Sequence, residues 1–317
     1  MKYAIISDIH GNLPALNAVL VDAEKRGVDG YILVGDYCLS NPYPNECISK
    51  IRELANAYVI RGNEERYLEN LIGKDQSTWT DGQMQISYFC YRKVSKENLE
   101  YLLGLPACLD IELNDVPVHI AHSSESFMEK CECKEWGPAK VAARYGEEKV
   151  TKERFLREMR SDLDGDTEFQ QIINDLPDGV YIFGHTHIQW SYKGKEGKRV
   201  FINPGSCGLP LDCIRESVPY TILDLSDKEN WYVEEIRVPF DMEAHIEKLR
   251  ASKQFEEAWV WSEVISKELR TCREHLTFFL GFVEEYAGKA GDSRRPFAVD
   301  TWEKAYEAWK GKTDEKE

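Results

Sequence analysis

The feature that most constrains the fold is a series of short apolar runs that each end in polar or glycine residues. The runs are rich in Val, Ile and Tyr, which is typical of buried β-strands. They are YAIIS (3–7), YILVG (31–35), YVIRG (58–62), VHIAH (118–122), YIFGH (181–185), VFINPG (200–205), YTILDL (220–225) and WYVEEIRV (231–238). This pattern predicts a core built on β-sheets.

Helical sequence connects the first three predicted strands. PALNAVLVDAEKRG has apolar residues at helical spacing between Pro14 near its start and Gly27 at its end. YPNECISKIRELAN (43–56) repeats this arrangement before the third strand. The order β-α-β-α-β predicts a parallel sheet at the N-terminal end of an α/β protein.

The remaining segments differ in composition from these strand and helix units. Residues 75–112 and 124–177 are polar and helix-forming, which indicates insertions between strands. The sequence therefore predicts a sheet-containing domain over residues 1–240 with these two insertions, and a helical extension over residues 241–317. The charged end GKTDEKE (311–317) is expected to fray.

Large apolar residues recur every three to four positions in the extension, as in an amphipathic helix. They are Trp261, Ile265, Leu269, Cys272, Leu276, Leu280, Val283, Trp302, Tyr306 and Trp309. Two interpretations are open: the extension packs on the core, or it binds a partner or a second copy of the chain.

The overall composition limits the class of protein. Hydrophobic residues make up 42% of the chain, and no stretch approaches the roughly 20 apolar residues of a membrane span. YAII after Met1 and Lys2 is too short for a signal-peptide core, so a cytoplasmic protein is expected. The net charge of −16 argues against a nucleic-acid scaffold. It is compatible with a small anionic substrate, because bound metal ions reverse the field locally.

The chain has nine cysteines, an odd number, and without an export signal we expect reduced thiols. Cys131 and Cys133 form a C-x-C pair of the kind that binds soft metals. No second cysteine pair follows at zinc-ribbon spacing, which argues against a structural zinc.

Polar residues that are able to bind metals follow five of the predicted strands. They are Asp8 and His10, Asp36, Asn63, His122, and His185 with His187. In open α/β sheets, ligands bind outside the carboxyl ends of the strands. A single histidine at a strand end is more often structural, and His119 within VHIAH is interpreted in that way. The combination predicts a binding site at one rim.

These residue types suit a site for two metal ions. Imidazole, carboxylate and amide oxygen together favour Mn, Fe, Zn or Co, whereas pure oxygen sites favour Ca or Mg. Asp8 and His10 are two residues apart, so both side chains can point to the same side of a strand end. One carboxylate can bridge ions about 3.5–4 Å apart, and such ions lower the pKa of bound water from 15.7 to roughly 7.

The order of these motifs resembles the calcineurin-like metallophosphoesterase superfamily. D-x-H at 8–10, G-D at 35–36, G-N at 62–63, His122 and G-H-T-H at 184–187 occur in the order typical of that family. FINPGSCGLPLD (201–212) is similar to the N-P-G-S segment of its compact bacterial phosphodiesterase branch. The resemblance covers residues 3 to about 238 and implies a four-layer α/β/β/α sandwich with two metal ions at its rim.

The resemblance also implies a role for each motif residue. Asp8, His10 and His187 would hold one ion, Asn63, His122 and His185 would hold the other, and Asp36 would bridge both. Two divalent cations are expected as cofactors, with Mn favoured over Fe, Zn or Co.

The chain departs from the family pattern after the third strand. Many relatives have G-N-H there, with a histidine that helps the leaving group or binds phosphate, whereas this chain has Glu64 after Asn63. Two neighbouring cations should lower the pKa of Glu64, which makes it a poor proton donor at pH 7. This predicts a preference for aryl phosphates and nucleotide phosphoanhydrides over alkyl phosphates. The alternative is that another group donates the proton and Glu64 caps the following helix.

The expected function is metal-dependent hydrolysis of a phosphomonoester, a phosphodiester or a nucleotide pyrophosphate by in-line attack of a metal-activated hydroxide. Asp36, Asn63 and Glu64 are the expected catalytic residues, and Arg61 is either a further charge-neutralising group or a surface residue. A small phosphorylated substrate is the expected partner, nucleotides included, and the extension could support a homo-oligomer. The alternative is a non-catalytic scaffold that binds partners through the extension, although such a scaffold would not need the full ligand set. A redox or oxygenase site fits seven ligands less well.

Overall fold

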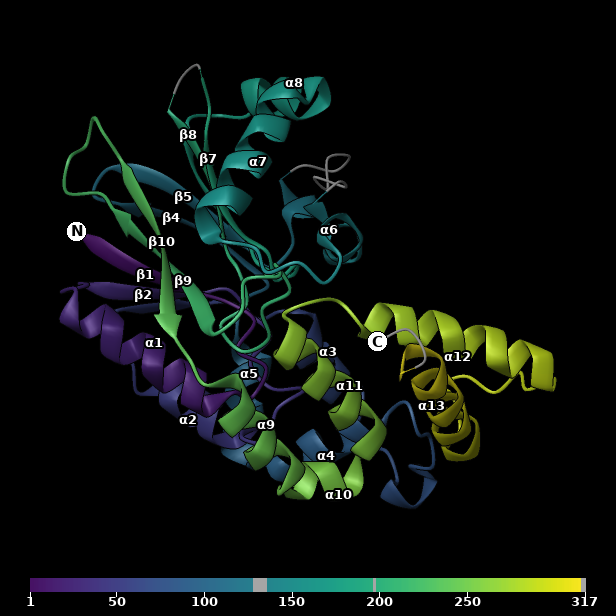
Figure 1. Ribbon diagram of the computed structural model, residues 1–317. Coiled ribbons are helices and arrows are strands. Elements are labelled where there is room, and N and C mark those ends of the chain that lie inside the picture. The colour runs from purple at the N-terminus through teal and green to yellow at the C-terminus, as the bar shows by residue number, and fades with distance from the viewer. Residues whose placement is uncertain (128–135, 196–197, 315–317) are drawn as a thin grey trace.

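Two β-sheets packed face to face form the centre of the molecule in the computed structural model, which describes residues 1–127, 136–195 and 198–314 (Figure 1). The first sheet has the strand order β10-β9-β1-β2-β3, and the second has the order β4-β5-β6-β8-β7. The strands of the first sheet are β1 (Lys2–Ile6), β2 (Gly30–Leu33), β3 (Ala57–Val59), β9 (Ser217–Asp224) and β10 (Tyr232–Pro239). Those of the second are β4 (Cys108–Leu113), β5 (Val116–Ala121), β6 (Gly179–Ile182), β7 (Gln189–Lys193) and β8 (Arg199–Pro204).

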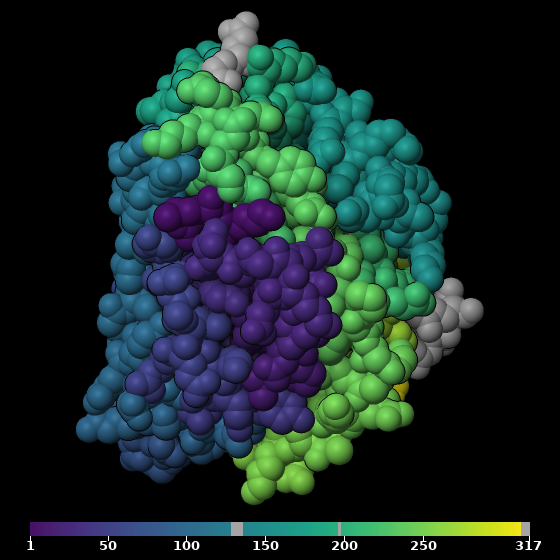
Figure 2. Space-filling model, turned by 90° about the vertical axis from the view of Figure 1, so that its left-hand side faces the viewer, coloured from purple at the N-terminus to yellow at the C-terminus, as the bar shows by residue number. Residues whose placement is uncertain are grey.

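The first sheet begins with the predicted β-α-β-α-β unit. β1 pairs with β2, and β2 with β3, in parallel, while β9 and β10 add antiparallel strands next to β1. The crossovers are α1 (Leu13–Lys25) and α2 (Pro44–Arg52). The Asn12 side chain caps the start of α1 by accepting a hydrogen bond from the Ala15 amide. On one face of the molecule, the purple N-terminal part of the chain lies beside green residues of its C-terminal half (Figure 2). α1 contacts β9 and β10, and Arg26 forms an ion pair with Glu234 of β10.

The second sheet contains two strands that the sequence analysis did not predict. β4 lies in the segment assigned to an insertion at 75–112, and β7 had no strand prediction. Both are edge strands that pair antiparallel with their neighbours, β4 with β5 and β7 with β8. β4 alternates between exposed and less exposed residues, and β7 has the polar sequence QWSYK. Neither strand therefore carries the continuous apolar run of a central strand.

Helices cover the outer faces of both sheets, which confirms the four-layer α/β/β/α sandwich. Apolar residues of the two sheets, such as Ile5 and Ile182, form the central core. On the outer side of the first sheet, α1 and α2 pack with helices of the extension. On the outer side of the second sheet lie α6 (Pro138–Tyr145), α7 (Lys152–Gly165) and α8 (Thr167–Asp175) (Figure 1).

The two segments predicted as insertions are largely helical where the structure describes them. α3 (Asn63–Glu69) precedes the first, which contains a short 3₁₀ turn (Gln76–Thr78), α4 (Gln85–Lys93) and α5 (Lys96–Gly104). The second begins with the 3₁₀ turn Ser124–Ser126 and continues through α6, α7 and α8.

The C-terminal extension is helical, as predicted. It comprises α9 (Met242–Arg250), α10 (Lys253–Glu257), α11 (Trp259–Thr271), α12 (Leu276–Ala290) and α13 (Val299–Asp314). Ile246 of α9 and Ile265 of α11 belong to the buried core outside the first sheet. α12 and α13 pack on each other and on α11 in a separate cluster that includes Trp302, to one side of the sheets (Figure 1).

Other features predicted from the sequence are partly covered by the structure. The described cysteines are free thiols, and most of them are buried. Cys131 and Cys133 lie outside the described residues. α13 continues to Asp314, so residues 311–314 of the end that was expected to fray are helical, and residues 315–317 are not described. None of the described helices is both long and apolar enough to cross a membrane.

Candidate metal centre

Six of the seven predicted metal ligands lie in loops that follow β1, β2, β5 and β6, and Asn63, the first residue of α3, follows β3. The carboxyl ends of these strands meet at one rim of the two sheets. Among the described residues, three groups have ligand atoms within 4.8 Å of one another, and two of these consist of predicted ligands only: Asp8, His10 and His187, and Asp36, His122 and His185. These two groups contain the histidines and carboxylates that the family resemblance assigns to separate ions, and the assignment itself stays a prediction.

The first group has the spacing of metal ligands. His10 Nε2 lies 3.0 Å from His187 Nε2, and His187 Nε2 lies 3.4 Å from Asp8 Oδ1. His10 Nε2 is 3.9 Å from the same Asp8 oxygen. Ligand atoms about 2.0–2.2 Å from one ion lie roughly 3.0–3.5 Å apart, so small shifts would complete this site.

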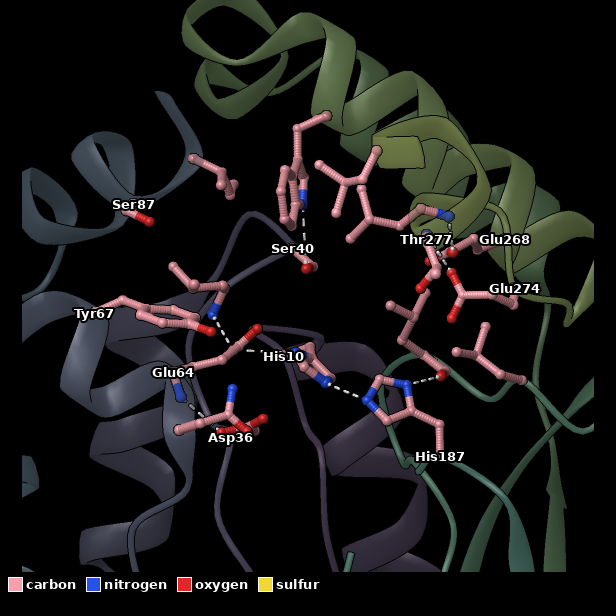
Figure 3. A pocket seen from close by; sticks show the side chains of 18 of the residues that line it. His10, Asp36, Ser40, Glu64, Tyr67, Ser87, His187, Glu268, Glu274 and Thr277 are labelled. Carbon is pink, nitrogen blue, oxygen red and sulfur yellow. Dashed lines mark hydrogen bonds and ion pairs between the residues drawn. The ribbon is translucent and has the colours of Figure 1, made fainter. Parts of the chain in front are cut away.

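The second group lies beside the first. His122 Nε2 is 3.1 Å from Asp36 Oδ2, and the rings of His122 and His185 are 5.2 Å apart. Asp36 also belongs to a third group with His10 and Glu64, so its carboxylate lies between the two sites. Figure 3 shows Asp36, Glu64, His10 and His187 together at the base of a pocket.

Unsatisfied buried atoms provide a test of whether these residues fit metal ions. Asp8 Oδ1 and Asn63 Oδ1 are buried and lack a hydrogen-bond partner. A buried oxygen without a partner is unfavourable by about 1–3 kcal/mol, and coordination of a cation would remove that cost. Imidazole, carboxylate and amide oxygen are also the ligand types of borderline divalent cations. The residues present therefore fit the two ions that the family implies.

Two of the histidine rings are oriented by backbone carbonyl groups. His187 Nδ1 is 2.8 Å from the Leu209 carbonyl oxygen, and His122 Nδ1 is 2.6 Å from that of Val34. A carbonyl oxygen can only accept, so Nδ1 carries the proton in both rings. In the neutral form of either ring, Nε2 then has a free electron pair directed to the site, as in most metal-binding histidines.

Five of the seven ligands have left-handed backbone conformations, with φ values of 53° at Asp8, 51° at His10, 55° at Asp36, 68° at His185 and 60° at His187. Asp and His adopt this region more readily than most residues, yet it is sparsely populated. Strained backbone of this kind concentrates at functional sites, where the surrounding structure maintains it.

The N-P-G-S segment holds two ligand loops in place. The Asn203 amide group donates to the Gly184 carbonyl oxygen and to the Thr186 hydroxyl, at 2.9 and 3.0 Å. The Ser206 hydroxyl donates to the Asp8 carbonyl oxygen at 2.7 Å. The sequence analysis used this segment only as a family signature and did not assign a role to Asn203 or Ser206.

Glu65 is a further supporting residue that the sequence analysis missed. Its carboxylate accepts hydrogen bonds from the amides of Gly62, Asp36 and Tyr37 at 2.7, 3.2 and 2.9 Å. It thereby connects the loops after β2 and β3 and caps α3. Gly62 allows the loop after β3 to lie close to Asp36, because a Cβ atom at residue 62 would collide with the Asp36 carboxylate.

Charges in the site stabilise one another without bound ions. Burial alone would raise the pKa of Asp8 and Asp36, but the adjacent histidines outweigh it and lower both values. Burial alone would lower the pKa of His10 and His122. The carboxylates beside them, chiefly Glu64 and Asp36 respectively, outweigh it and raise the values to about 9 and about 10. The carboxylates and histidines of the centre thus favour each other's charged forms.

Glu64 contacts a ligand histidine and does not cap the helix. Its Oε2 lies 3.1 Å from His10 Nδ1 and accepts a hydrogen bond from the Leu39 amide at 3.0 Å. The capping role that was the alternative for Glu64 belongs to Glu65. Burial raises the pKa of Glu64 without bound ions. The lowering expected beside two cations stays a prediction.

Two other residues considered from the sequence have structural partners. His119 Nδ1 lies 2.6 Å from Asp110, and its ring stacks on Tyr181, in agreement with a structural role. Arg61 pairs with Glu69 of α3 at 3.3 Å. That ion pair agrees with the interpretation of Arg61 as a surface residue.

A pocket of about 420 Å³ lies over the centre, with His10, Asp36, Asn63, Glu64, His185 and His187 among its lining residues. The extension also lines it, through Trp261, Glu268, Glu274, Leu276, Thr277 and Leu280. The sequence analysis did not place the extension near the metal centre.

Comparison with known proteins agrees with this geometry. The family model of the calcineurin-like phosphoesterase superfamily domain matches residues 1–228, and the chain therefore belongs to that superfamily. The chain is 30% identical over 262 residues to an uncharacterized protein of Methanocaldococcus jannaschii. The aligned region covers 78% of this chain and 90% of that protein.

Two solved structures share the fold. A metallophosphoesterase from Sphaerobacter thermophilus has a TM-score of 0.57 at 23% identity, over 86% of this chain and 100% of that one. A hypothetical protein from Pyrococcus horikoshii has a TM-score of 0.57 at 19% identity, over 86% of this chain and 99% of that one. The resemblance predicted from the motifs is thus confirmed at the level of the superfamily.

Proposed function

We propose that this protein hydrolyses phosphate esters with two divalent metal ions, Mn favoured. The observation that carries the proposal is the pair of adjacent ligand groups, Asp8 with His10 and His187, and Asp36 with His122 and His185. Asn63 completes the second group through its unpaired Oδ1. When bound, such ions lower the pKa of a water molecule to near neutrality and counter the charge of the attacked phosphoryl group.

The residues of the chain have separate tasks in this proposal. Asp36 lies between the two groups and holds them at a fixed separation. Removal of its ring from water and the nearby His122 lower the pKa of His185, so its ring is neutral at pH 7. The His185 ring can therefore bind a cation at the pocket side of the site without first losing a proton. Partners are expected to be small phosphorylated molecules.

Turnover of an aryl phosphate monoester and an aryl phosphate diester, with Mn supplied after chelation, tests the proposal. Asp36→Asn should abolish turnover of both and leave the fold intact, because a neutral amide would hold divalent cations much more weakly than the carboxylate. His119→Asn is the matched control, since His119 lies outside the site, and it should keep wild-type turnover. Metal binding without any turnover of phosphate esters would favour the non-catalytic scaffold instead.

A further inference from the structure

The pocket over the metal centre has a wall that belongs entirely to the extension. α11 contributes Trp261 and Glu268, and α12 contributes Leu276, Thr277 and Leu280. In Figure 3, Glu268, Glu274 and Thr277 lie across the pocket from Asp36 and Glu64. A group attached to a phosphate at the metal centre would therefore lie against the extension.

Three side chains of the extension hold this wall to the loop that follows Asp36. Gln254 donates to the Ser40 carbonyl oxygen at 2.8 Å, and Trp261 donates to the Ser40 hydroxyl at 3.2 Å. His245 Nε2 lies 2.8 Å from Asn41 Oδ1. The wall and the metal centre are thus joined through one short loop, and the pocket is built into the fold.

The start of α12 is fixed as well. Glu268 is buried and accepts hydrogen bonds from the amides of His275 and Leu276, at 2.8 and 2.7 Å. Glu274 accepts one from the Thr277 amide at 2.7 Å. These contacts set the position from which Leu276 and Leu280 reach the pocket.

The lining combines large apolar side chains with acidic groups. Leu39, Met84, Ile86, Trp261, Leu276 and Leu280 supply the apolar surface, and Glu268 and Glu274 supply two carboxyl groups. No Lys or Arg occurs among the lining residues that the structure describes. A volume of about 420 Å³ falls within the range of roughly 300–1,000 Å³ typical of small-molecule sites. Such a pocket favours an apolar group and disfavours a second anionic one.

We propose that the extension selects the substrate: a phosphate ester of an aromatic or similarly apolar alcohol that carries no second phosphate and no carboxylate. The inference rests on the phosphoesterase activity proposed above and narrows it. Of the three substrate classes expected from the sequence, it disfavours nucleotide pyrophosphates, because their additional phosphate would approach the carboxylate of Glu274.

The size of the organic group is tested with naphthyl and phenyl phosphate, whose alcohols are similar in acidity. The wild type should show a higher kcat/KM for naphthyl phosphate, by about tenfold. Leu280→Trp, which fills the pocket, should remove that preference. Phe278→Trp is the control on the same helix, because Phe278 is 47% exposed and does not line the pocket. A preference unchanged in Leu280→Trp would overturn the proposal.

The charge of the wall is tested with Glu274→Gln, which keeps an acceptor for the Thr277 amide. It should raise kcat/KM for a nucleoside diphosphate relative to naphthyl phosphate by about tenfold. Glu285→Gln, at an exposed position of α12, should leave that ratio unchanged. An equal response of the two variants would contradict the charge part of the proposal.

Binding of naphthol to the protein after metal removal separates this inference from the proposed function. Calorimetry should detect binding to the wild type and at least tenfold weaker binding to Leu280→Trp. Naphthol binding without turnover of any phosphate ester would contradict the proposed function and leave the pocket assignment standing. If the protein hydrolyses phosphate esters but neither binds naphthol nor prefers naphthyl phosphate, this inference is contradicted and the proposed function is not.

Discussion

At the scale of single residues, Glu64 is the site residue at which the sequence differs from the G-N-H motif expected from the family resemblance. Its carboxylate contacts His10 and the Leu39 amide, so it orients a ligand and lies close to the reacting groups. Glu64→His would introduce a group that can donate a proton. We expect a gain of about tenfold or more on an alkyl phosphate relative to an aryl phosphate, because general acid help matters most for poor leaving groups.

The control for this prediction is Glu64→Gln, which keeps a hydrogen-bond acceptor for Leu39 and cannot transfer a proton. It should lower the rates on both esters by the same factor. If Glu64→His also changes both esters equally, Glu64 acts only by positioning His10.

Protonation of the ligand histidines gives a second prediction at this scale. Without ions, neighbouring carboxylates raise the pKa of His10 to about 9 and of His122 to about 10, against an ordinary value of 6.5. Both rings must lose a proton to bind metal, so metal binding at pH 7 should release about two protons per chain. Apparent affinity should then rise with pH up to about 9 to 10. Calorimetric titration in two buffers of different ionisation enthalpy measures the number of protons released on metal binding. If no protons are released at pH 7, the assignment of His10 and His122 as metal ligands is wrong.

The raised pKa values of His10 and His122 also make the free energy of unfolding depend on pH. Because the folded values lie above 6.5, the two histidines contribute stability to the ion-free protein that is complete below pH 6.5. That contribution should be lost as pH rises through about 9 to 10.

At the scale of elements, α11 connects the extension to the core outside the first sheet. Ile265 has no exposed surface and packs in that core. Ile265→Ala should lower the free energy of unfolding by about 2–5 kcal/mol, through lost burial and the cavity it leaves. Phe278→Ala on α12 is the control and should change it by less than about 0.5 kcal/mol. Urea denaturation measures the free energy of unfolding of both variants. If both variants lose the same small amount, α11 contributes little to the core.

How far the sequence predicts these elements depends on where they lie in the sheets. Central strands such as β1 and β6 are buried on both faces, so their apolar runs are continuous and easily recognised. The edge strands β4 and β7 are partly polar and pair on one side only, and they escaped prediction. Six of the seven predicted ligand residues follow the central strands β1, β2, β5 and β6, and Asn63 follows the edge strand β3, which has the apolar run YVI. The pocket wall of α11 and α12 was not predicted, since only tertiary packing brings Trp261 and Leu280 to the metal centre.

At the scale of the whole molecule, the two sheets and the extension act together at one site. The sheets bring five strand ends to a common rim, and the extension closes the pocket above it. A homo-oligomer formed through the extension stays a prediction, for which the mass of the protein in solution is the measurement.

The central claim is that two metal ions bind side by side with Asp36 between them. Crystals of the protein grown with Mn, measured at the Mn absorption edge, test it most directly. The account predicts two anomalous peaks about 3.5–4 Å apart, one beside Asp8, His10 and His187 and the other beside Asn63, His122 and His185. A single peak after full reconstitution, or two peaks without Asp36 between them, would contradict it.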